Sequence, residues 1–337
     1  MNKLWLFLAA GILGSLYFFQ SSFKVNNHQP KGKRSFPQVS QPVFIPKSLN
    51  SPNFQFQNDS RVQAQSVKLQ ASTKKDTILP LQQLYQNFTY SQKIEFIQQQ
   101  SKRISRMISS HEENLTQIEY ETIKLYLDSY AQRIDTNHHQ IWKDSMNQKL
   151  QQVAYTFAPH IIEVFEKEKL PPQIGLYLAM IESEFHECLT SPAGAKGMFQ
   201  FMPATAAQYG LDPKDRCDWK KSASAAARYM KDRIFQFGVD GGSVTLALAG
   251  YNRGPQSVMR DMSKVLENND SVRTFWTLAR EKKSLDKYFQ NENSKYVPKF
   301  FAAAILGENP WAFGIPLAAL STYRHSPAEP KLHFSAQ

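Results

Sequence analysis

The spacing of apolar residues is the feature that most constrains this fold. From Leu81 onward they recur at helical intervals, whereas the apolar–polar alternation typical of β-strands is scarce. Ile94, Ile97, Ile104 and Ile108 fit one face of a helix. The pattern continues through Ile123, Leu127, Tyr130, Ile134, Trp142, Met146, Leu150, Val153, Phe157 and Ile161. We therefore expect an all-α protein.

The positive charge of the chain lies mainly in its amino-terminal part. A net charge of +11 would by itself suggest a nucleic-acid partner. Residues 1–80, however, hold ten Lys and Arg against two Asp and Glu, which leaves only +3 for the rest. We therefore predict that the folded part has no nucleic-acid partner.

The chain begins with a pattern typical of an export signal. Lys3 precedes 16 uncharged, mostly apolar residues at 4–19. As a helix they would reach ~24 Å, slightly less than a ~30 Å hydrocarbon core. We predict that residues 1–22 are a signal anchor, with a cleaved signal peptide as the close alternative and a buried core helix as the third. Either of the first two places the rest of the chain outside the cytoplasm.

Residues 23–80 are rich in Gln, Ser, Asn and Pro and lack hydrophobic periodicity. This composition predicts a disordered, basic linker. Its positive charges would suit an anionic membrane or wall polymer. A merely solvated tether fits the same composition equally well.

One carboxylate in the next part of the chain is predicted to lie against apolar surface. Pro171 and Pro172 indicate a helix start. The apolar stripe of this helix is formed by Ile174, Leu178, Ile181 and Phe185. Glu182 lies about 60° from the centre of the stripe, whereas Glu184 and Glu187 point away from it. Desolvation would keep Glu182 protonated near neutral pH, so it can act as a proton donor. We expect Glu184 and Glu187 to be ordinary surface carboxylates.

Three motifs in order resemble the lytic transglycosylases that contain a soluble-lytic-transglycosylase domain. The first is residues 181–211, IESEFHECLTSPAGAKGMFQFMPATAAQYGL, and the others are GYNRG at 250–254 and KYVPK at 295–299. The resemblance is strongest to the membrane-bound D type and covers about residues 155–315. It implies a lysozyme-like, goose-type helical catalytic domain.

The resemblance also implies a role for each matching residue. Glu182 takes the position of the single catalytic acid and base. The positions that line the sugar subsites or contact substrate are Ser191, Gln200, Met202, Thr205, Tyr251, Asn252 and Glu292. The stretch after Glu292 departs from the family pattern, because Asn293 and Ser294 stand where Thr and a basic residue are usual.

The chemistry implied by the resemblance needs one carboxylate and no metal or organic cofactor. Most glycosidases use two carboxylates. In this family the N-acetyl group of the sugar assists instead. The enzyme cleaves the β-1,4 bond between N-acetylmuramic acid and N-acetylglucosamine in peptidoglycan without water, and a 1,6-anhydromuramyl end results.

These inferences predict how the chain is organised. We expect a helical segment at 81–155 that packs on or leads into the catalytic domain, the domain itself at 156–320 and a tail at 321–337. The 27 residues after Pro310 are too few for the family's carboxy-terminal wall-binding repeats. We therefore expect a periplasmic protein tethered to the inner membrane through its amino terminus, with peptidoglycan glycan strands as substrate. A wall-synthesis or secretion partner is a further expectation.

The two cysteines, Cys188 and Cys217, are an even number in a compartment predicted to be oxidising. We predict a disulfide that closes a loop of about 30 residues and stabilises the fold by roughly 3–4 kcal/mol. Two separate thiols are the alternative.

Two other functions fit parts of this pattern. A goose-type lysozyme would hydrolyse the same bond with water, and Glu292 is the only acidic residue in the motifs that could position that water. A non-catalytic wall-binding scaffold of a secretion or division machine would not need Glu182 and Gln200 together. Lytic transglycosylase activity is therefore the leading interpretation.

Overall fold

Helices supply all the regular secondary structure among residues 83–134, 145–238, 241–267 and 272–324, which are the residues that the computed structural model describes. The only β-type pairings there are isolated bridges, Thr190 with Lys196 and Lys196 with Phe201. The all-α prediction is thus confirmed for this part of the chain. The predicted anchor at 1–22, the linker at 23–80, Trp142 and residues 325–337 of the tail lie outside the described residues.

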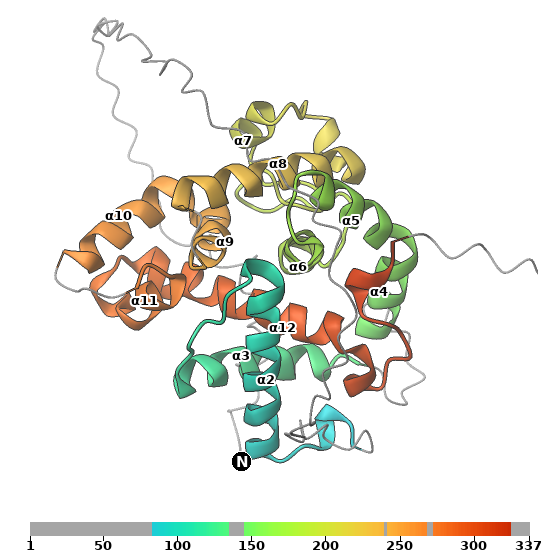
Figure 1. Cartoon of the computed structure of the whole chain (residues 1–337). Helices are drawn as coiled ribbons and strands as arrows, with labels where there is room; N and C mark the ends of the chain where they lie inside the picture. Colours follow the sequence, from blue (N-terminus) through green and yellow to red (C-terminus); the bar gives the residue numbers. More distant parts are fainter. Residues whose placement is uncertain (1–82, 135–144, 239–240, 268–271, 325–337) are drawn as a thin grey trace, which may run out of the picture. The chain divides into compact units, whose positions relative to one another are not determined.

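Two amino-terminal helices begin at capping boxes. α2 (Tyr90–Ser109) follows Thr89, and α3 (Gln117–Ala131) follows Thr116; in each helix the side chain three residues after the cap bonds back to the cap. Ile97 and Ile104 of α2 are fully buried, as the helical pattern predicts. Both helices pack on α12 (Ser294–Glu308), which runs through the middle of the view in Figure 1. Residues 83–131 therefore share the core of the following helices.

The next helices lead to the centre of the fold. α4 (Met146–Gln152) continues through the π-helix η2 (Val153–Phe157) into α5 (Ala158–Lys167), and α6 (Pro172–Ser183) then packs between α5 and α12. α6 begins at the predicted proline pair. It is not amphipathic, because every residue from Gln173 to Ile181 is buried. The predicted single apolar stripe is therefore wrong: a helix that is apolar on all sides is surrounded by others.

The remaining helices complete the described part of the fold. They are α7 (Pro203–Gln208), η3 (Asp215–Cys217), α8 (Trp219–Phe237), α9 (Ser243–Arg253), α10 (Pro255–Leu266), α11 (Phe275–Arg280), η4 (Lys282–Ser284), the π-helix η5 (Phe289–Asn293), η6 (Pro310–Phe313) and η7 (Leu320–Thr322), besides η1 (Tyr85–Asn87) before α2. α9 packs against α8, α10 and α12.

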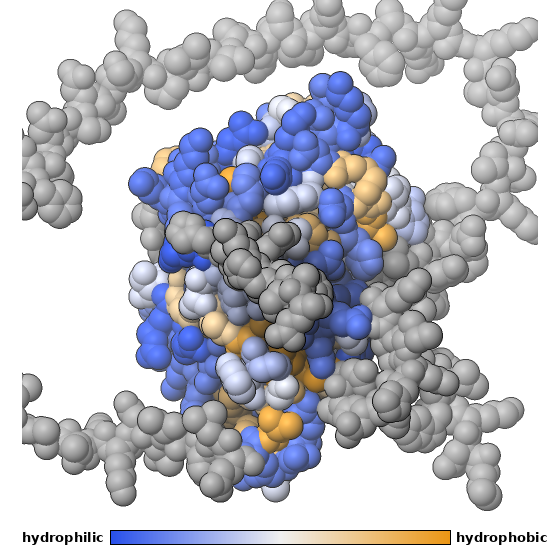
Figure 2. Space-filling view, turned by 90° about the vertical axis from the view of Figure 1, so that its right-hand side faces the viewer, coloured by the Kyte–Doolittle hydropathy of each residue, from blue (hydrophilic) through white to orange (hydrophobic). Residues whose placement is uncertain are grey.

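The surface seen from the side of α4 and α5 is mostly hydrophilic, with small hydrophobic patches between the polar residues (Figure 2). Among the described residues, no helix combines the length and the apolar character that a membrane crossing requires.

Candidate active site

Glu182 lies in the last turn of α6, where α12 reaches it with two side chains. It is half-buried, and Oε1 accepts a hydrogen bond from the hydroxyl of Tyr296. One turn further along α12, the Nζ of Lys299 donates to the backbone oxygen of Ile181 at 3.3 Å. Tyr296 and Lys299 are three residues apart and therefore project from the same face of α12. The end of α6 is thus held by α12 beside the carboxylate.

The surroundings of Glu182 shift its proton affinity to the neutral range. Burial raises the pKa of Glu182 to about 7, although the hydrogen bond from Tyr296 and the positive charge of Lys299 both lower it. Burial in turn lowers the pKa of Lys299. A carboxyl group with a pKa near the working pH can both donate a proton and take one back.

Glu184 has a different environment, and the prediction that it is an ordinary surface carboxylate is wrong. Its Oε1 lies 2.5 Å from Nη1 of Arg133, and its Oε2 lies 2.6 Å from Nζ of Lys149. These hydrogen-bonded cations outweigh the effect of burial and lower the pKa of Glu184 to about 2. Glu187 is exposed, as predicted. Of Glu182 and Glu184, only Glu182 is therefore poised to exchange a proton near neutral pH.

The loop after α6 is shaped by its own polar side chains. Gln200 has a φ of +47°, and its Nε2 donates to the backbone oxygens of Leu189 at 3.0 Å and Gly197 at 2.8 Å. Ser191 Oγ accepts a hydrogen bond from the backbone nitrogen of Ala195 at 3.0 Å. The predicted site residues Ser191 and Gln200 therefore hold the loop in shape, in addition to any contact with a ligand.

Three further contacts fix this loop to its neighbours. Ser183 Oγ, next to Glu182 in the chain, donates to the backbone oxygen of Met198 at 2.8 Å. Gly197 has a φ of +88°, and a Cβ there would lie 1.7 Å from the backbone oxygen of Arg216, so only glycine fits. A disulfide joins Cys188 to Cys217, with 4.6 Å between the Cα atoms.

Tyr251 approaches the same region from the end of α9. Its hydroxyl donates to the backbone oxygen of Phe199 at 2.7 Å, and its ring packs edge-on against Tyr229 with 5.0 Å between centroids. Burial and the nearby charge of Glu182 raise the pKa of Tyr251 well above its usual range. Tyr251 is thus near the candidate acid and also supports the loop.

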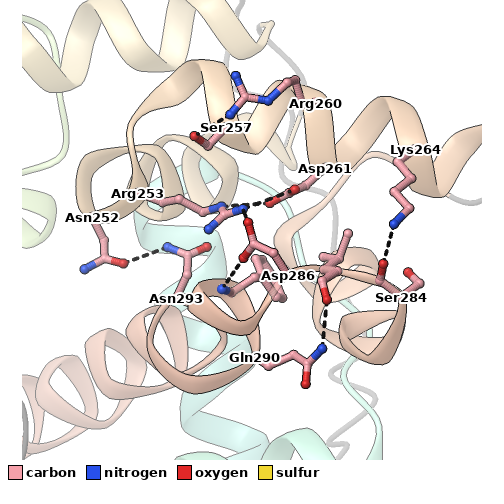
Figure 3. A network of polar contacts seen from close by, with 12 residues as sticks. Asn252, Arg253, Ser257, Arg260, Asp261, Lys264, Ser284, Asp286, Gln290 and Asn293 are labelled. Carbon is pink, nitrogen blue, oxygen red and sulfur yellow. Dashed lines mark hydrogen bonds and ion pairs between the residues drawn. The ribbon is translucent and has the colours of Figure 1, made fainter. Parts of the chain in front are cut away.

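The remaining predicted residues differ in exposure. Met202 and Glu292 are exposed, whereas Thr205 and Asn252 are half-buried. Asn252 Oδ1 accepts a hydrogen bond from Nδ2 of the fully buried Asn293 at 2.9 Å (Figure 3). Asn293 also donates to the backbone oxygen of Ala249 at 3.0 Å. These contacts tie the end of α9 to η5, the helical turn that carries Glu292.

Sequence reasoning did not assign roles to Tyr296 and Lys299. Both lie in the KYVPK motif, and their three-residue spacing was the available signal that they share one helix face.

No group of three His, Cys, Asp or Glu residues within the described ranges could hold a metal ion.

Comparisons with known proteins find a matching family model and a similar curated protein. Residues 159–273 match the family model described as the transglycosylase SLT domain. The membrane-bound lytic murein transglycosylase D of Escherichia coli K12 is 28% identical over 174 residues, which are 51% of this chain and 35% of that protein. The chain thus matches about a third of the length of this curated relative.

Two solved structures are also similar. The 70 kDa soluble lytic transglycosylase of Escherichia coli aligns with a TM-score of 0.39 and 17% identity, over 60% of this chain and 32% of that one. The lytic transglycosylase Slt of Pseudomonas aeruginosa, solved as an inactive mutant, aligns with a TM-score of 0.38 and 16% identity, over 72% and 38%.

The matched range contains α6 with Glu182, the loop with Gln200 and the end of α9 with Tyr251, whereas Glu292, Tyr296 and Lys299 follow it. Over residues 159–273 the match thus agrees with the family resemblance seen in the sequence.

Proposed function

We propose that this chain is a peptidoglycan lytic transglycosylase that cleaves the β-1,4 bond between N-acetylmuramic acid and N-acetylglucosamine. The observation that carries the proposal is the half-buried carboxyl of Glu182, whose pKa is about 7 and which Tyr296 holds in place. It lies within the range that matches the SLT domain. Glu182 acts as the single acid and base.

The reaction proceeds in two proton transfers through the same carboxyl group. Glu182 first donates its proton to the glycosidic oxygen, and the bond from that oxygen to C1 of the muramyl residue breaks. The acetamide of that sugar stabilises the cationic centre. The ionised Glu182 then takes the proton of the C6 hydroxyl as its oxygen bonds to C1, which yields a 1,6-anhydro sugar.

The groups around Glu182 suit both stages. Burial favours the protonated carboxyl that begins the reaction. After the first transfer, the hydroxyl of Tyr296 and the charge of Lys299 stabilise the carboxylate. The opposing effects account for a pKa close to neutral, where one group can serve as acid and then as base.

The surroundings of Glu184 and Glu292 favour a mechanism in which the N-acetyl group of the substrate assists Glu182. Glu184 is engaged by Arg133 and Lys149, so it is not free to act on a sugar. Glu292 is exposed on η5. We assign Glu292 to substrate binding, together with Ser191, Gln200, Met202, Thr205, Tyr251 and Asn252.

We further propose that the protein works in the bacterial cell envelope, where its substrate is found. The relative that is called membrane-bound, and the apolar amino-terminal segment, support a periplasmic enzyme tethered to the inner membrane. The same export route would bring the protein to any wall-synthesis or secretion partner.

Product analysis of digested peptidoglycan tests this proposal. The wild-type protein should release muropeptides with anhydro ends, which are one water lighter than the reducing ends that a lysozyme produces. Glu182→Gln should fold with an unchanged thermal midpoint and release nothing, whereas the matched control Glu187→Gln should remain active. Reducing ends in the wild-type digest would instead establish a hydrolase, and residual activity of Glu182→Gln would remove Glu182 from its assigned role.

A further inference from the structure

Tyr288 is an exposed aromatic residue beside the candidate active site that neither motif nor fold accounts for. It is the residue directly before η5, and 44% of it is exposed. The next residue, Phe289, is fully buried and anchors the turn. The exposed part of the Tyr288 ring can contact a ligand.

A buried cation lies under the ring of Tyr288. The guanidinium carbon of Arg253 is 5.5 Å from the centre of the Tyr288 ring and 5.9 Å from that of Phe289. This is within the range of cation–π attraction, which strengthens as the cation loses its water. The side chain of Arg253 is only 6% exposed.

Two aspartates fix the guanidinium in this position (Figure 3). Nε of Arg253 lies 2.8 Å from Oδ2 of Asp261 on α10, and Nη2 lies 2.6 Å from Oδ2 of Asp286. Asp286 also accepts a hydrogen bond from the backbone nitrogen of Phe289 at 2.9 Å. Arg253 therefore joins the end of α9, α10 and the turn that carries Tyr288, which limits the movement of the ring.

Tyr288 stands four residues before Glu292, and η5 runs directly into α12, whose Tyr296 bonds to Glu182. Burial raises the pKa of the Tyr288 phenol, and the charges of Glu292 and Glu182 raise it further, whereas the charge of Arg253 lowers it. The hydroxyl is thus within the electrostatic influence of the candidate acid and of the predicted substrate-binding Glu292. An exposed, fixed ring at this place would meet a glycan strand on its way to Glu182.

We propose that Tyr288 is a sugar-stacking residue of the glycan-binding groove and that Arg253 is its positioning residue. The apolar face of an N-acetylated sugar ring packs on the phenyl ring of Tyr288, and Arg253 holds that ring in place from below. This inference rests on the proposed function, because it names a contact for the same substrate.

Binding of a β-1,4-linked N-acetylglucosamine tetramer tests the role of Tyr288 without relying on turnover. We would measure it by titration calorimetry in the Glu182→Gln background, so that no bond is cleaved. Tyr288→Ala should weaken binding about tenfold, in line with about 1.4 kcal/mol for an aromatic contact. Tyr288→Phe, which keeps the ring, should bind within about twofold of the parent. The control is Tyr90→Ala, since Tyr90 is 55% exposed on α2 and bonds to Glu121.

A double-mutant cycle tests the positioning role of Arg253. Arg253→Lys keeps the charge but cannot bind both aspartates with a planar fork, so it should weaken tetramer binding several-fold. In the Tyr288→Ala background, Arg253→Lys should have no further effect on tetramer affinity. If Arg253 had a purely structural role, Arg253→Lys would lower the thermal midpoint in both backgrounds. Its effect on tetramer affinity would then be the same whether or not Tyr288 is present.

Two results would overturn the inference. If Tyr288→Ala binds the tetramer as well as the parent does, including the case in which neither binds, Tyr288 is not a stacking residue. If the effects of Arg253→Lys and Tyr288→Ala add, Arg253 does not position the ring. Digestion of peptidoglycan by the wild-type protein is a separate measurement. If the wild-type protein digests peptidoglycan but tetramer binding does not depend on Tyr288, only this inference is rejected. If binding depends on Tyr288 but the wild-type protein does not digest peptidoglycan, only the proposed function is rejected.

Discussion

The hydroxyl of Tyr296 on α12 donates a hydrogen bond to Oε1 of Glu182 at the end of α6. The two residues are far apart in the sequence, so the proton affinity of the candidate acid depends on the packing of two central helices. Loss of this bond has a definite electrostatic consequence, because the bond lowers the pKa of Glu182.

Tyr296→Phe should raise the pKa of Glu182 and reduce turnover of peptidoglycan. A hydrogen bond to a charged group is worth about 1.5–3 kcal/mol, so kcat should fall roughly 10- to 100-fold. The basic limb of the pH–rate profile should move to higher pH, because the carboxylate has lost a donor. Tyr126→Phe is the matched control, since it removes another partly buried phenol. A profile that stays in place would show that the bond does not act on Glu182.

The pH dependence of the wild-type activity should report the pKa of Glu182 directly. The free enzyme must be protonated at this residue to start the reaction, and the pKa is about 7. Above that value kcat/KM should therefore fall about tenfold per pH unit. The measurement is the release of soluble fragments from purified peptidoglycan at constant ionic strength between pH 5 and 9. An activity that keeps rising to pH 9 would contradict the assignment of Glu182 as the acid.

Glu184→Gln should lower the free energy of unfolding. The pKa of Glu184 is about 2 in the folded protein and returns to about 4.5 on unfolding, so the ion pairs stabilise the fold above pH 4.5. That stability is lost as the pH falls toward 2. We expect the substitution to reduce the free energy of unfolding by on the order of 2 kcal/mol at pH 7, because Arg133 and Lys149 lose their shared partner.

Thermal unfolding between pH 3 and 7 measures this effect. The matched control is Glu187→Gln, which removes an exposed carboxylate three residues further along. Equal midpoints for both variants at pH 7 would show that the cluster around Glu184 does not stabilise the end of α6.

The helical pattern of the sequence was sufficient to predict the helices and much of the core. Ile97, Ile104, Ile123 and Leu127 are all fully buried, because periodicity is a local property that the chain displays directly. The motif residues likewise pointed to Glu182, because the motif around it is a continuous stretch of sequence.

The environment of the site could not be predicted in the same way. Glu184 was expected to be solvated, yet its partners Arg133 and Lys149 come from segments 51 and 35 residues earlier in the chain. The helical wheel placed Glu182 at the edge of an apolar stripe, but α6 is buried on all sides, so its surroundings depend on α12 instead. Such contacts depend on how helices pack, which a single sequence does not display.

Glu113 is a buried acid whose protonation should make stability depend on pH. It lies between α2 and α3, is 5% exposed and faces Thr245 of α9. Burial raises its pKa to about 8, and Glu119 adds to the rise, whereas Thr245, Trp276 and Arg280 oppose it. The Thr245 hydroxyl lies 2.9 Å from Oε1 of Glu113 and 3.1 Å from the backbone oxygen of Gly242. Since one hydroxyl proton cannot serve two acceptors fully, the hydrogen bond that Thr245 donates to Glu113 offsets only part of the effect of burial.

The folded protein should therefore lose stability as the pH rises. The pKa of Glu113 is about 8 when folded and about 4.5 when unfolded, so the folded state holds an extra proton between these values. The free energy of unfolding should fall by on the order of 3 kcal/mol from pH 5 to pH 9. Glu113→Gln, which keeps the shape and a donor, should remove most of this slope, whereas the control Glu112→Gln should keep it. Urea unfolding at both pH values measures the difference, and equal slopes in the two variants would show that Glu113 is not the titrating group.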